Sequence, residues 1–319
     1  MLDLPRLQAL RAVQTFGTVT AAAGALHCTP SAISQHIAKL ERETKATLVE
    51  KDGRRLRLTE AGRILAEHAG LVLAAVEEAE AALAAHQETV SGRLSVSSFP
   101  TACRGLLPHA LRRLAAEHPG LEPTLLESDR ETSFDGILRG IIDVALIDEW
   151  VEIPVTYPPG VASVELGLDV ADLVLPAGHP LAFGTGPVTL DEVREERWIA
   201  SRPGTVCHEW LLRMLPGLAP SILVNEFETQ LTFVAEGLGV AFVPRLARTS
   251  LPAGTVARPV TPEAARRVSV AWRAAAGIRP AIAATVAVLQ DAWRHRASTA
   301  APFGDLPVWV PGQDLVHVV

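Results

Sequence analysis

Residues 18–37 read TVTAAAGALHCTPSAISQHI, and this stretch predicts two short helices joined by a tight turn. Thr18 is a favourable N-cap for the first helix, and Gly17 ends an earlier apolar helix before it. Thr29 is a favourable N-cap for the second, where Pro30 takes the first helical position. The small alanines between the caps allow a neighbouring helix to approach closely. The stretch therefore predicts a compact group of three helices.

The third of these helices has two contrasting faces. Ile33, Ile37 and Leu40 fall on one side at helical spacing. The opposite face and its flanks carry short polar or basic side chains, namely Ser31, Ser34, Gln35, Lys39 and Arg42. Such a face can enter the major groove of DNA, where Gln pairs with adenine and Lys reaches guanine or phosphate. A solvated helix face has the same pattern, so the helix alone leaves both interpretations open.

The segment that follows, residues 48–62, favours DNA binding. It predicts a strand, a turn at Asp52-Gly53 and a second strand, which together form a two-stranded wing. Lys51, Arg54 and Arg55 cluster at its tip, where they can hold phosphate groups. Residues 1–63 carry ten Lys or Arg and six Asp or Glu, a net charge of +4 within a chain of net charge −7. A small basic domain on an acidic body is typical of nucleic-acid binding.

The order of these residues resembles the winged helix-turn-helix of LysR-type transcriptional regulators over about the first sixty residues. The resemblance rests on Thr18-Val19-Thr20-Ala21-Ala22, Ala32-Ile33-Ser34-Gln35 and Leu58-Thr59-Glu60-Ala61-Gly62. It implies DNA contacts at Thr18, Thr29, Pro30, Ser31, Ser34, Gln35, Lys39, Lys51, Arg54 and Arg55. The family often has Gln at the position of Pro30, so the base preference at one operator position is expected to differ.

Residues 59–90 contain no proline and are rich in Ala, Leu and Glu, which predicts one long connecting helix. Apolar residues step alternately by four and three, the period of a coiled-coil seam. The resembling family dimerises through this helix, so we expect a dimer interface at Leu65, Ala69, Val72, Val76, Ala79 and Leu83. Packing of this face against the chain's own body is the alternative. A two-fold dimer implies a roughly palindromic DNA site.

Residues 91–296 alternate short apolar runs with helical patterns, which predicts an α/β domain. Gly178-His179-Pro180-Leu181 and Val234-Ala235-Glu236-Gly237-Leu238-Gly239 resemble the LysR-type effector domain. The resemblance implies two subdomains, as in periplasmic solute-binding proteins of type 2, with an effector between them. We expect subdomain I at about 91–165 and 267–296 and subdomain II at about 166–266. The winged domain then spans 1–58, and a tail spans 297–319.

Position by position, the resemblance implies effector contacts at Thr101, Arg130, Ser201, Arg202, Glu226 and Thr229, the last two in a loop. An arginine at position 130 can bind a carboxylate through two hydrogen bonds. We therefore expect a small anionic or amphoteric effector, such as a small carboxylate or an amino acid. A solvent-facing Arg130 beside Asp129 and Glu131 is the equal alternative.

An enzyme is not predicted, because common catalytic, nucleotide-binding and metal-binding motifs are missing from the sequence. No cofactor or metal is expected. Three widely spaced cysteines predict neither a disulfide framework nor a metal site, and apolar runs are too short for a membrane span. We expect a cytoplasmic homodimer or homotetramer that binds double-stranded DNA, with RNA polymerase as a possible further partner.

Two alternatives remain. A regulator of the same family could sense oxidants through Cys207, whose pKa the neighbouring His208 could lower, although a buried, inert thiol is favoured. A solute-binding module without regulatory DNA binding is disfavoured by the basic winged segment.

Overall fold

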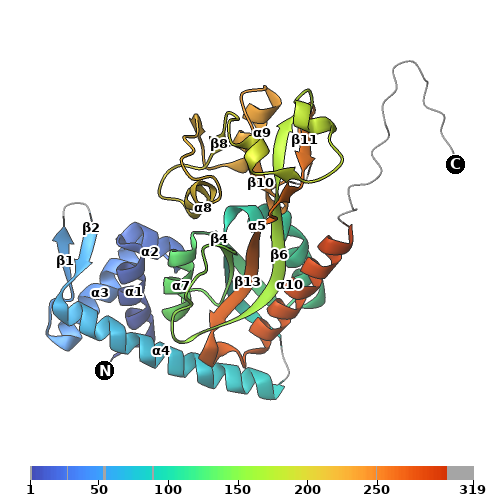
Figure 1. Cartoon of the computed structure of the whole chain (residues 1–319). Helices are drawn as coiled ribbons and strands as arrows, with labels where there is room; N and C mark the ends of the chain where they lie inside the picture. Colours follow the sequence, from blue (N-terminus) through green and yellow to red (C-terminus); the bar gives the residue numbers. More distant parts are fainter. Residues whose placement is uncertain (1, 27, 53–54, 88–89, 249, 300–319) are drawn as a thin grey trace.

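The computed structural model describes residues 2–26, 28–52, 55–87, 90–248 and 250–299 (Figure 1). Its first part is a bundle of α1 (Leu4–Phe16), α2 (Val19–Ala25) and α3 (Pro30–Thr44). Gly17 ends α1 with φ +68°, a conformation that favours glycine. Thr18 Oγ1 accepts a hydrogen bond from the Ala21 N–H at 3.1 Å, and Thr29 Oγ1 accepts one from the Ala32 N–H at 3.2 Å. The predicted helices and both caps are confirmed.

The wing consists of β1 (Val49–Asp52) and β2 (Arg55–Leu58), which pair antiparallel with Val49 opposite Leu58. Glu41, on α3, ties the wing to the bundle, because its carboxylate accepts hydrogen bonds from the Leu48 N–H at 2.8 Å and the Val49 N–H at 3.3 Å. One apolar core joins helices and wing and includes Leu7, Leu10, Val13, Ile33, Ile37, Leu40, Leu48 and Leu58.

The long helix α4 (Glu60–Gln87) runs beneath both the bundle and the body (Figure 1). At about 1.5 Å per residue it is roughly 42 Å long. Thr59 Oγ1 accepts a hydrogen bond from the Gly62 N–H at 3.0 Å at the start of the helix. A Cβ at Gly62 would lie 2.0 Å from the Leu48 carbonyl oxygen, so only glycine permits this close approach to the wing.

The body is built on a mixed seven-stranded sheet in the described residues. Six strands run in the order β10-β6-β13-β5-β3-β4, and β11 also pairs with β6. β3 pairs parallel with β4 and β5, whereas β13 pairs antiparallel with β5 and β6. Their bounds are β3 (Gly92–Ser98), β4 (Leu121–Glu127), β5 (Val144–Trp150), β6 (Val161–Pro176), β10 (Ala241–Pro244), β11 (Thr255–Arg258) and β13 (Ala264–Arg273).

Two lobes share the long strands β6 and β13 (Figure 1). Lobe I, beside the bundle and α4, contains β3, β4 and β5 with α5 (Pro100–Gly105), α6 (Leu107–Glu117), α7 (Arg130–Leu138) and α10 (Pro280–Thr299). Lobe II, at the top of the view, contains β10 and β11 with β7 (Val188–Thr189), β8 (Ile199–Ala200), α8 (Val206–Met214), β9 (Ile222–Leu223), α9 (Phe227–Ala235) and β12 (Val260–Thr261). Short 3₁₀ turns complete the chain at Pro180–Phe183, Asp191–Val193, Arg245–Ala247 and Ala274–Ala276.

Each lobe has its own apolar core. The core of lobe I joins sheet and helices through Leu94, Val96, Leu107, Leu114, Val268, Ile282 and Leu289. The main core of lobe II gathers Trp150, Leu173, Trp198, Trp210, Val240 and Phe242. Within the described residues, no helix is both long enough and apolar enough to span a membrane.

Candidate functional site

The polar face of α3 is presented to solvent. Ile33, Ile37 and Leu40 are buried in the bundle, whereas the side chains of Thr29, Pro30, Ser31, Ser34, Gln35 and Lys39 are exposed on the other side. Ser34 Oγ donates a hydrogen bond to the Pro30 carbonyl oxygen at 3.1 Å, within its own helix. Gln35 and Lys39 therefore project polar groups from the exposed face, and Thr18 caps α2 next to it.

The wing tip is only partly described. Arg54 lies outside the described residues, and for Lys51 and Arg55 the structure gives the backbone alone, at positions on β1 and β2. Further down the wing, the Arg57 guanidinium forms an ion pair with Glu50 at 2.9 Å.

The predicted seam on α4 is divided between the interior and the surface. Ala69 is 1% exposed in the core of the helical bundle, and Leu65 packs against the same core. Val72, Ala79 and Leu83 are exposed instead. The bundle covers the first part of this face, at Leu65 and Ala69, and leaves Val72, Ala79 and Leu83 exposed further along the helix. The exposed apolar side chains of α4 are Ile64, Leu71, Val72 and Leu83, and Val76 is half-buried.

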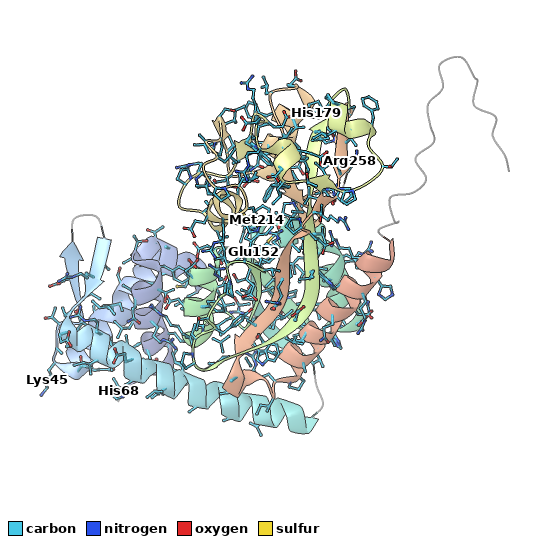
Figure 2. All side chains as sticks on the ribbon, viewed as in Figure 1. Lys45, His68, Glu152, His179, Met214 and Arg258 are labelled. Atoms are coloured by element: carbon cyan, nitrogen blue, oxygen red, sulfur yellow. The ribbon has the colours of Figure 1, made fainter. Side chains whose placement is uncertain are left out.

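His68 lies on the same outward side of α4 and points away from the rest of the chain (Figure 2). It is four residues after Ile64 and three before Leu71, which makes the three side chains neighbours on the helix surface. Ile64, His68 and Leu71 therefore form an exposed stripe beside the predicted seam, whose residues Val72 and Leu83 are exposed as well.

A cleft of about 780 Å³ opens between the two lobes. Figure 2 shows Glu152 and Met214 in the zone where the lobes meet. Lobe I contributes the end of β4 and the beginnings of α5 and α7, and lobe II contributes the beginnings of α8 and α9. Helix starts with their capping residues thus line both sides, an arrangement suited to polar ligands of small-molecule size.

Four of the six predicted effector residues line this cleft, namely Thr101, Arg130, Ser201 and Glu226. Arg202 is exposed outside the lining, and its backbone N–H donates a hydrogen bond to Asn225 Oδ1 at 3.0 Å. Glu226 lies at the end of the predicted loop, as the N-cap of α9, but the loop prediction for Thr229 was wrong because Thr229 lies within that helix. Phe227 and Gln230 occupy the buried face of α9, and Thr229 is left on the exposed face, away from the cleft.

Arg130 faces the cleft from the first position of α7. Its guanidinium donates to Glu131 Oε1 at 3.1 and 3.2 Å and to the Asp148 carbonyl oxygen at 3.3 Å. Asp129 caps the same helix, where it accepts a hydrogen bond from the Thr132 N–H at 2.7 Å. Arg130 is therefore neither a free anion site nor simply solvated, since a carboxylate of its own helix already occupies it.

Arg266, on β13, lies at the floor of the cleft and was not among the predicted site residues. Its side chain is 2% exposed and pairs with Asp169 at 2.8 Å and Asp148 at 2.9 Å. It also donates a hydrogen bond to Thr101 Oγ1. Burial alone would lower the pKa of Arg266, but the charges of Asp169 and Asp148 outweigh it and raise that pKa above its ordinary value. The sequence signal was present, since Arg266 shares one strand face with Val268 and Val270.

Cys207 lines the cleft in the first turn of α8 rather than in a loop. Burial raises the pKa of its thiol, and this outweighs the lowering effect of Arg266. His208 Nδ1 lies 2.8 Å from the Ser201 carbonyl oxygen, so this histidine is engaged with the backbone. The expectation that His208 could lower the pKa of Cys207 is not met. The site disfavours the thiolate that oxidant sensing requires.

Among the described residues, no group of three or more His, Cys, Asp or Glu side chains is arranged to hold a metal ion.

Comparison with known proteins gives two family matches. Residues 4–63 match the bacterial regulatory helix-turn-helix protein of the lysR family, and residues 87–294 match the LysR substrate binding domain. A probable hydrogen peroxide-inducible genes activator from Mycobacterium xenopi is 35% identical over 184 residues, which cover 56% of this chain and 93% of that protein.

Solved structures share the fold. A cysteine variant of full-length OxyR from Pseudomonas aeruginosa has a TM-score of 0.70 at 22% identity and covers 92% of this chain and 95% of its own. Full-length CbnR in complex with its target DNA has a TM-score of 0.55 at 21% identity and covers 91% of this chain and 100% of its own. At these identities the likeness concerns the architecture alone.

Proposed function

The chain belongs to the LysR family of DNA-binding transcriptional regulators, which have an effector-binding domain, and on that premise we propose how it binds DNA and how it is switched. In this proposal residues 1–58 bind a roughly palindromic promoter site, residues 59–90 link the subunits of a homodimer or homotetramer, and residues 91–296 bind a small-molecule effector. The protein acts in the cytoplasm, where RNA polymerase is the machinery whose access it controls.

The exposed polar face of α3 is the observation that carries the DNA-binding proposal. Gln35 reads a base edge, and Ser31, Ser34 and Lys39 make adaptable base or phosphate contacts. Lys51, Arg54 and Arg55 hold the phosphate backbone from the wing. Thr18 and Thr29 cap the N-termini of α2 and α3. Pro30 occupies a position where the family often has Gln.

Dimerisation is proposed through the exposed apolar side chains of α4, namely Ile64 and Leu71 together with Val72 and Leu83 of the predicted seam. Ile64, Leu71 and Leu83 are 51%, 69% and 65% exposed, which is unusual for large apolar side chains along one helix. A second α4 packed against them would bury these side chains. A two-fold axis through that contact would present two copies of α3 to one face of the duplex.

Switching is proposed to act through the two lobes. An effector in the cleft contacts residues of both lobes, so it binds most tightly to the lobe arrangement that presents both sets of contacts. This difference in affinity between two arrangements is the free energy available to shift the placement of the DNA-binding domains. The strands β6 and β13 cross between the lobes, and they carry Asp169 and Arg266 at the cleft floor.

A solute-binding module without DNA binding has no support, because the helix-turn-helix match covers residues 4–63. The Mycobacterium xenopi relative is described as a probable activator of hydrogen peroxide-inducible genes. For this chain, the raised pKa of Cys207 weighs against a thiol-based switch.

Two sets of substitutions test the DNA-binding proposal on the DNA that the wild-type protein selects. Gln35→Ala is expected to cost roughly 1–3 kcal/mol on the preferred site and to relax the preference at one base pair. Arg54→Ala with Arg55→Ala is expected to weaken binding to all sequences and to reduce the slope of log K against log salt by about 2.

Gln8→Ala, an exposed glutamine on α1, is the matched control and should leave binding unchanged. A uniform loss across sequences for Gln35→Ala would remove this residue from base reading. An unchanged salt slope for the double arginine variant would remove the wing from phosphate binding. Fluorescence anisotropy on labelled duplexes measures both quantities.

A further inference from the structure

The lining of the cleft is acidic. Six carboxylates line it, from Glu127, Asp129, Glu131, Asp148, Glu209 and Glu226, against three guanidinium groups, from Arg104, Arg130 and Arg266. The lining therefore has a net charge of −3 with all these groups ionised. A cleft lined by one sign of charge concentrates ligands of the opposite sign, because its protein walls focus the field.

Each of the three arginines is already bound to carboxylates of the chain. Arg104 pairs with Glu228 at 3.1 Å and with Glu226 at 3.5 Å. Arg130 pairs with Glu131 at 3.1 Å. Arg266, at the buried floor, pairs with aspartates on β5 and β6. An anionic effector would have to displace a carboxylate from one of these arginines, and the displaced carboxylate would remain in the cleft beside it.

Two glutamates of the lining are free to bind a ligand. The side chains of Glu127, at the end of β4 in lobe I, and Glu209, on α8 in lobe II, are exposed. Neither side chain forms a hydrogen bond or ion pair with another described residue. Because they come from different lobes, a cation held by both would offset the negative charge on each wall and favour the approach of the lobes.

A second feature beside the cleft is a buried hydrogen-bond donor, the indole N–H of Trp150. Trp150 is 1% exposed, and its indole N–H faces the Cys207 thiol, a weak acceptor, with no oxygen or nitrogen partner within the described part of the chain. It lines a small pocket of about 20 Å³ that shares Ser201, Cys207 and Phe227 with the cleft. A buried N–H whose acceptor is a thiol gains from an oxygen acceptor, so a ligand atom or a bridging water that reaches this pocket is stabilised.

From these two features we propose that the effector is a small amine or guanidine with a hydrogen-bond acceptor, the class that includes basic amino acids, and not a simple carboxylate. The cationic group binds between Glu127 and Glu209, and the acceptor end reaches toward Ser201 and the Trp150 N–H. This inference rests on the proposed effector function of the cleft. Of the two expected effector classes, it keeps the amino acid and sets aside the small carboxylate.

Calorimetric titration of the full-length protein at low salt tests the proposal with matched probes. The amine probes are L-lysine, L-arginine and 1,5-diaminopentane, and glutarate and benzoate are the carboxylate probes. At least one amine probe is expected to bind about tenfold or more tightly than glutarate, with an affinity that falls as sodium chloride is raised. The amino acids are expected to bind more tightly than 1,5-diaminopentane, which lacks the acceptor.

Variants locate the binding to the cleft. Glu127→Gln with Glu209→Gln is expected to weaken amine binding about tenfold or more, because it removes two charges and preserves shape. Glu122→Gln with Glu195→Gln removes two exposed glutamates, on β4 and in lobe II, that do not line the cleft, and it should leave amine binding unchanged.

Tighter binding of glutarate than of every amine, no binding of any amine, or equal amine binding by the two double variants would each overturn the proposal. These outcomes are distinct from a failure of the regulator itself. The same preparation is assayed for binding to selected DNA, which does not depend on the charge of the effector.

Discussion

Asp169 is the residue on which the floor of the cleft depends. Its buried carboxylate on β6 accepts hydrogen bonds from Arg266 Nε at 3.0 Å and from the Leu246 N–H at 2.8 Å. It thus joins the crossing strand β13 to the short turn that follows β10 in lobe II. With Asp148 it places two carboxylates around one buried arginine, so the loss of either leaves the charge of Arg266 less well compensated.

Asp169→Asn is expected to lower the free energy of unfolding by roughly 3–5 kcal/mol, because it removes one charge of a buried ion pair and leaves the other in place. For a chain of this size the melting temperature should fall by roughly 5–15 °C. Asp191→Asn is the control, since Asp191 pairs with Arg194 at 3.7 Å with its side chain 93% exposed. The control should change stability by less than about 0.5 kcal/mol. Equal melting temperatures for the two variants would contradict a stabilising role of the buried pair.

The reactivity of the Cys207 thiol distinguishes a regulator switched by an effector from one switched by oxidants. Because burial raises its pKa, the reactive thiolate is scarce at neutral pH and becomes abundant only above the ordinary cysteine range. At pH 7.5 the exposed Cys28 is expected to react with iodoacetamide about tenfold or more faster than Cys207. Peptide mass spectrometry measures both rates. Faster alkylation of Cys207, or a rate that levels off below pH 8, would restore the redox interpretation.

At the scale of elements, α4 makes contacts on two sides. One side packs into the helical bundle through Ala66, Ala69 and Leu73. The opposite side presents Ile64 and Leu71 to solvent, and Leu83 is exposed on the face of the predicted seam. Apolar residues spaced alternately four and three positions apart predict a helix with an apolar face. They do not predict which part of the molecule packs against that face. The bundle covers Leu65 and Ala69 of the predicted seam and leaves Val72, Ala79 and Leu83 exposed.

Leu71→Glu with Leu83→Glu is expected to raise the dimer dissociation constant by about tenfold or more, because charges would be placed on an apolar contact. Phe183→Glu, at a side chain 77% exposed in lobe II, serves as the control and should leave that constant unchanged. Sedimentation velocity over a range of concentrations gives the constants. Ala69→Leu should instead lower stability by about 1–3 kcal/mol through overpacking of the bundle core. Loss of the dimer in Ala69→Leu at unchanged stability would favour the predicted seam.

Local signals explain which elements could be predicted from the sequence. Thr18, Thr29 and Gly17 mark helix ends through their own backbone chemistry, so α1, α2 and α3 were expected with nearly correct bounds. Thr229 was misplaced because α9 follows a very short strand, and its helical period emerges only from the burial of Phe227, Gln230 and Leu231. Arg266 was missed because its two partners lie 97 and 118 residues away in the chain. Contacts of such range depend on the tertiary fold.

At the scale of the whole molecule, the body and the DNA-binding part are joined by two helices, of which α7 begins at the cleft. α4 packs against α1 and against the Ala274–Ala276 turn of the body. α7 begins at the cleft with Arg130, and directly after it Arg139 donates a hydrogen bond to Thr15 Oγ1 on α1 at 3.0 Å. Figure 1 shows α7 between the helical bundle and the sheet. The chain therefore has a direct physical route between the ligand site and the DNA-binding domain.

This junction brings together charges of one sign. Arg11, on α1, is 5% exposed, and burial followed by the charges of Arg139 and Arg273 lowers its pKa to about 10. Asp135 is the carboxylate that offsets them. Arg11 still carries its proton at neutral pH, so the contact between the DNA-binding part and the body includes unfavourable like-charge pairs. Such a contact is more readily rearranged than an apolar one, as an effector-switched regulator requires.

Selection of bound fragments from genomic DNA by the purified full-length protein tests the central claim most directly. The account predicts enrichment of fragments that share a palindromic site, with two half-sites on one face of the duplex, and loss of that enrichment for Gln35→Ala. Folded protein that enriches no sequence over random DNA would contradict the claim that this chain is a sequence-specific regulator.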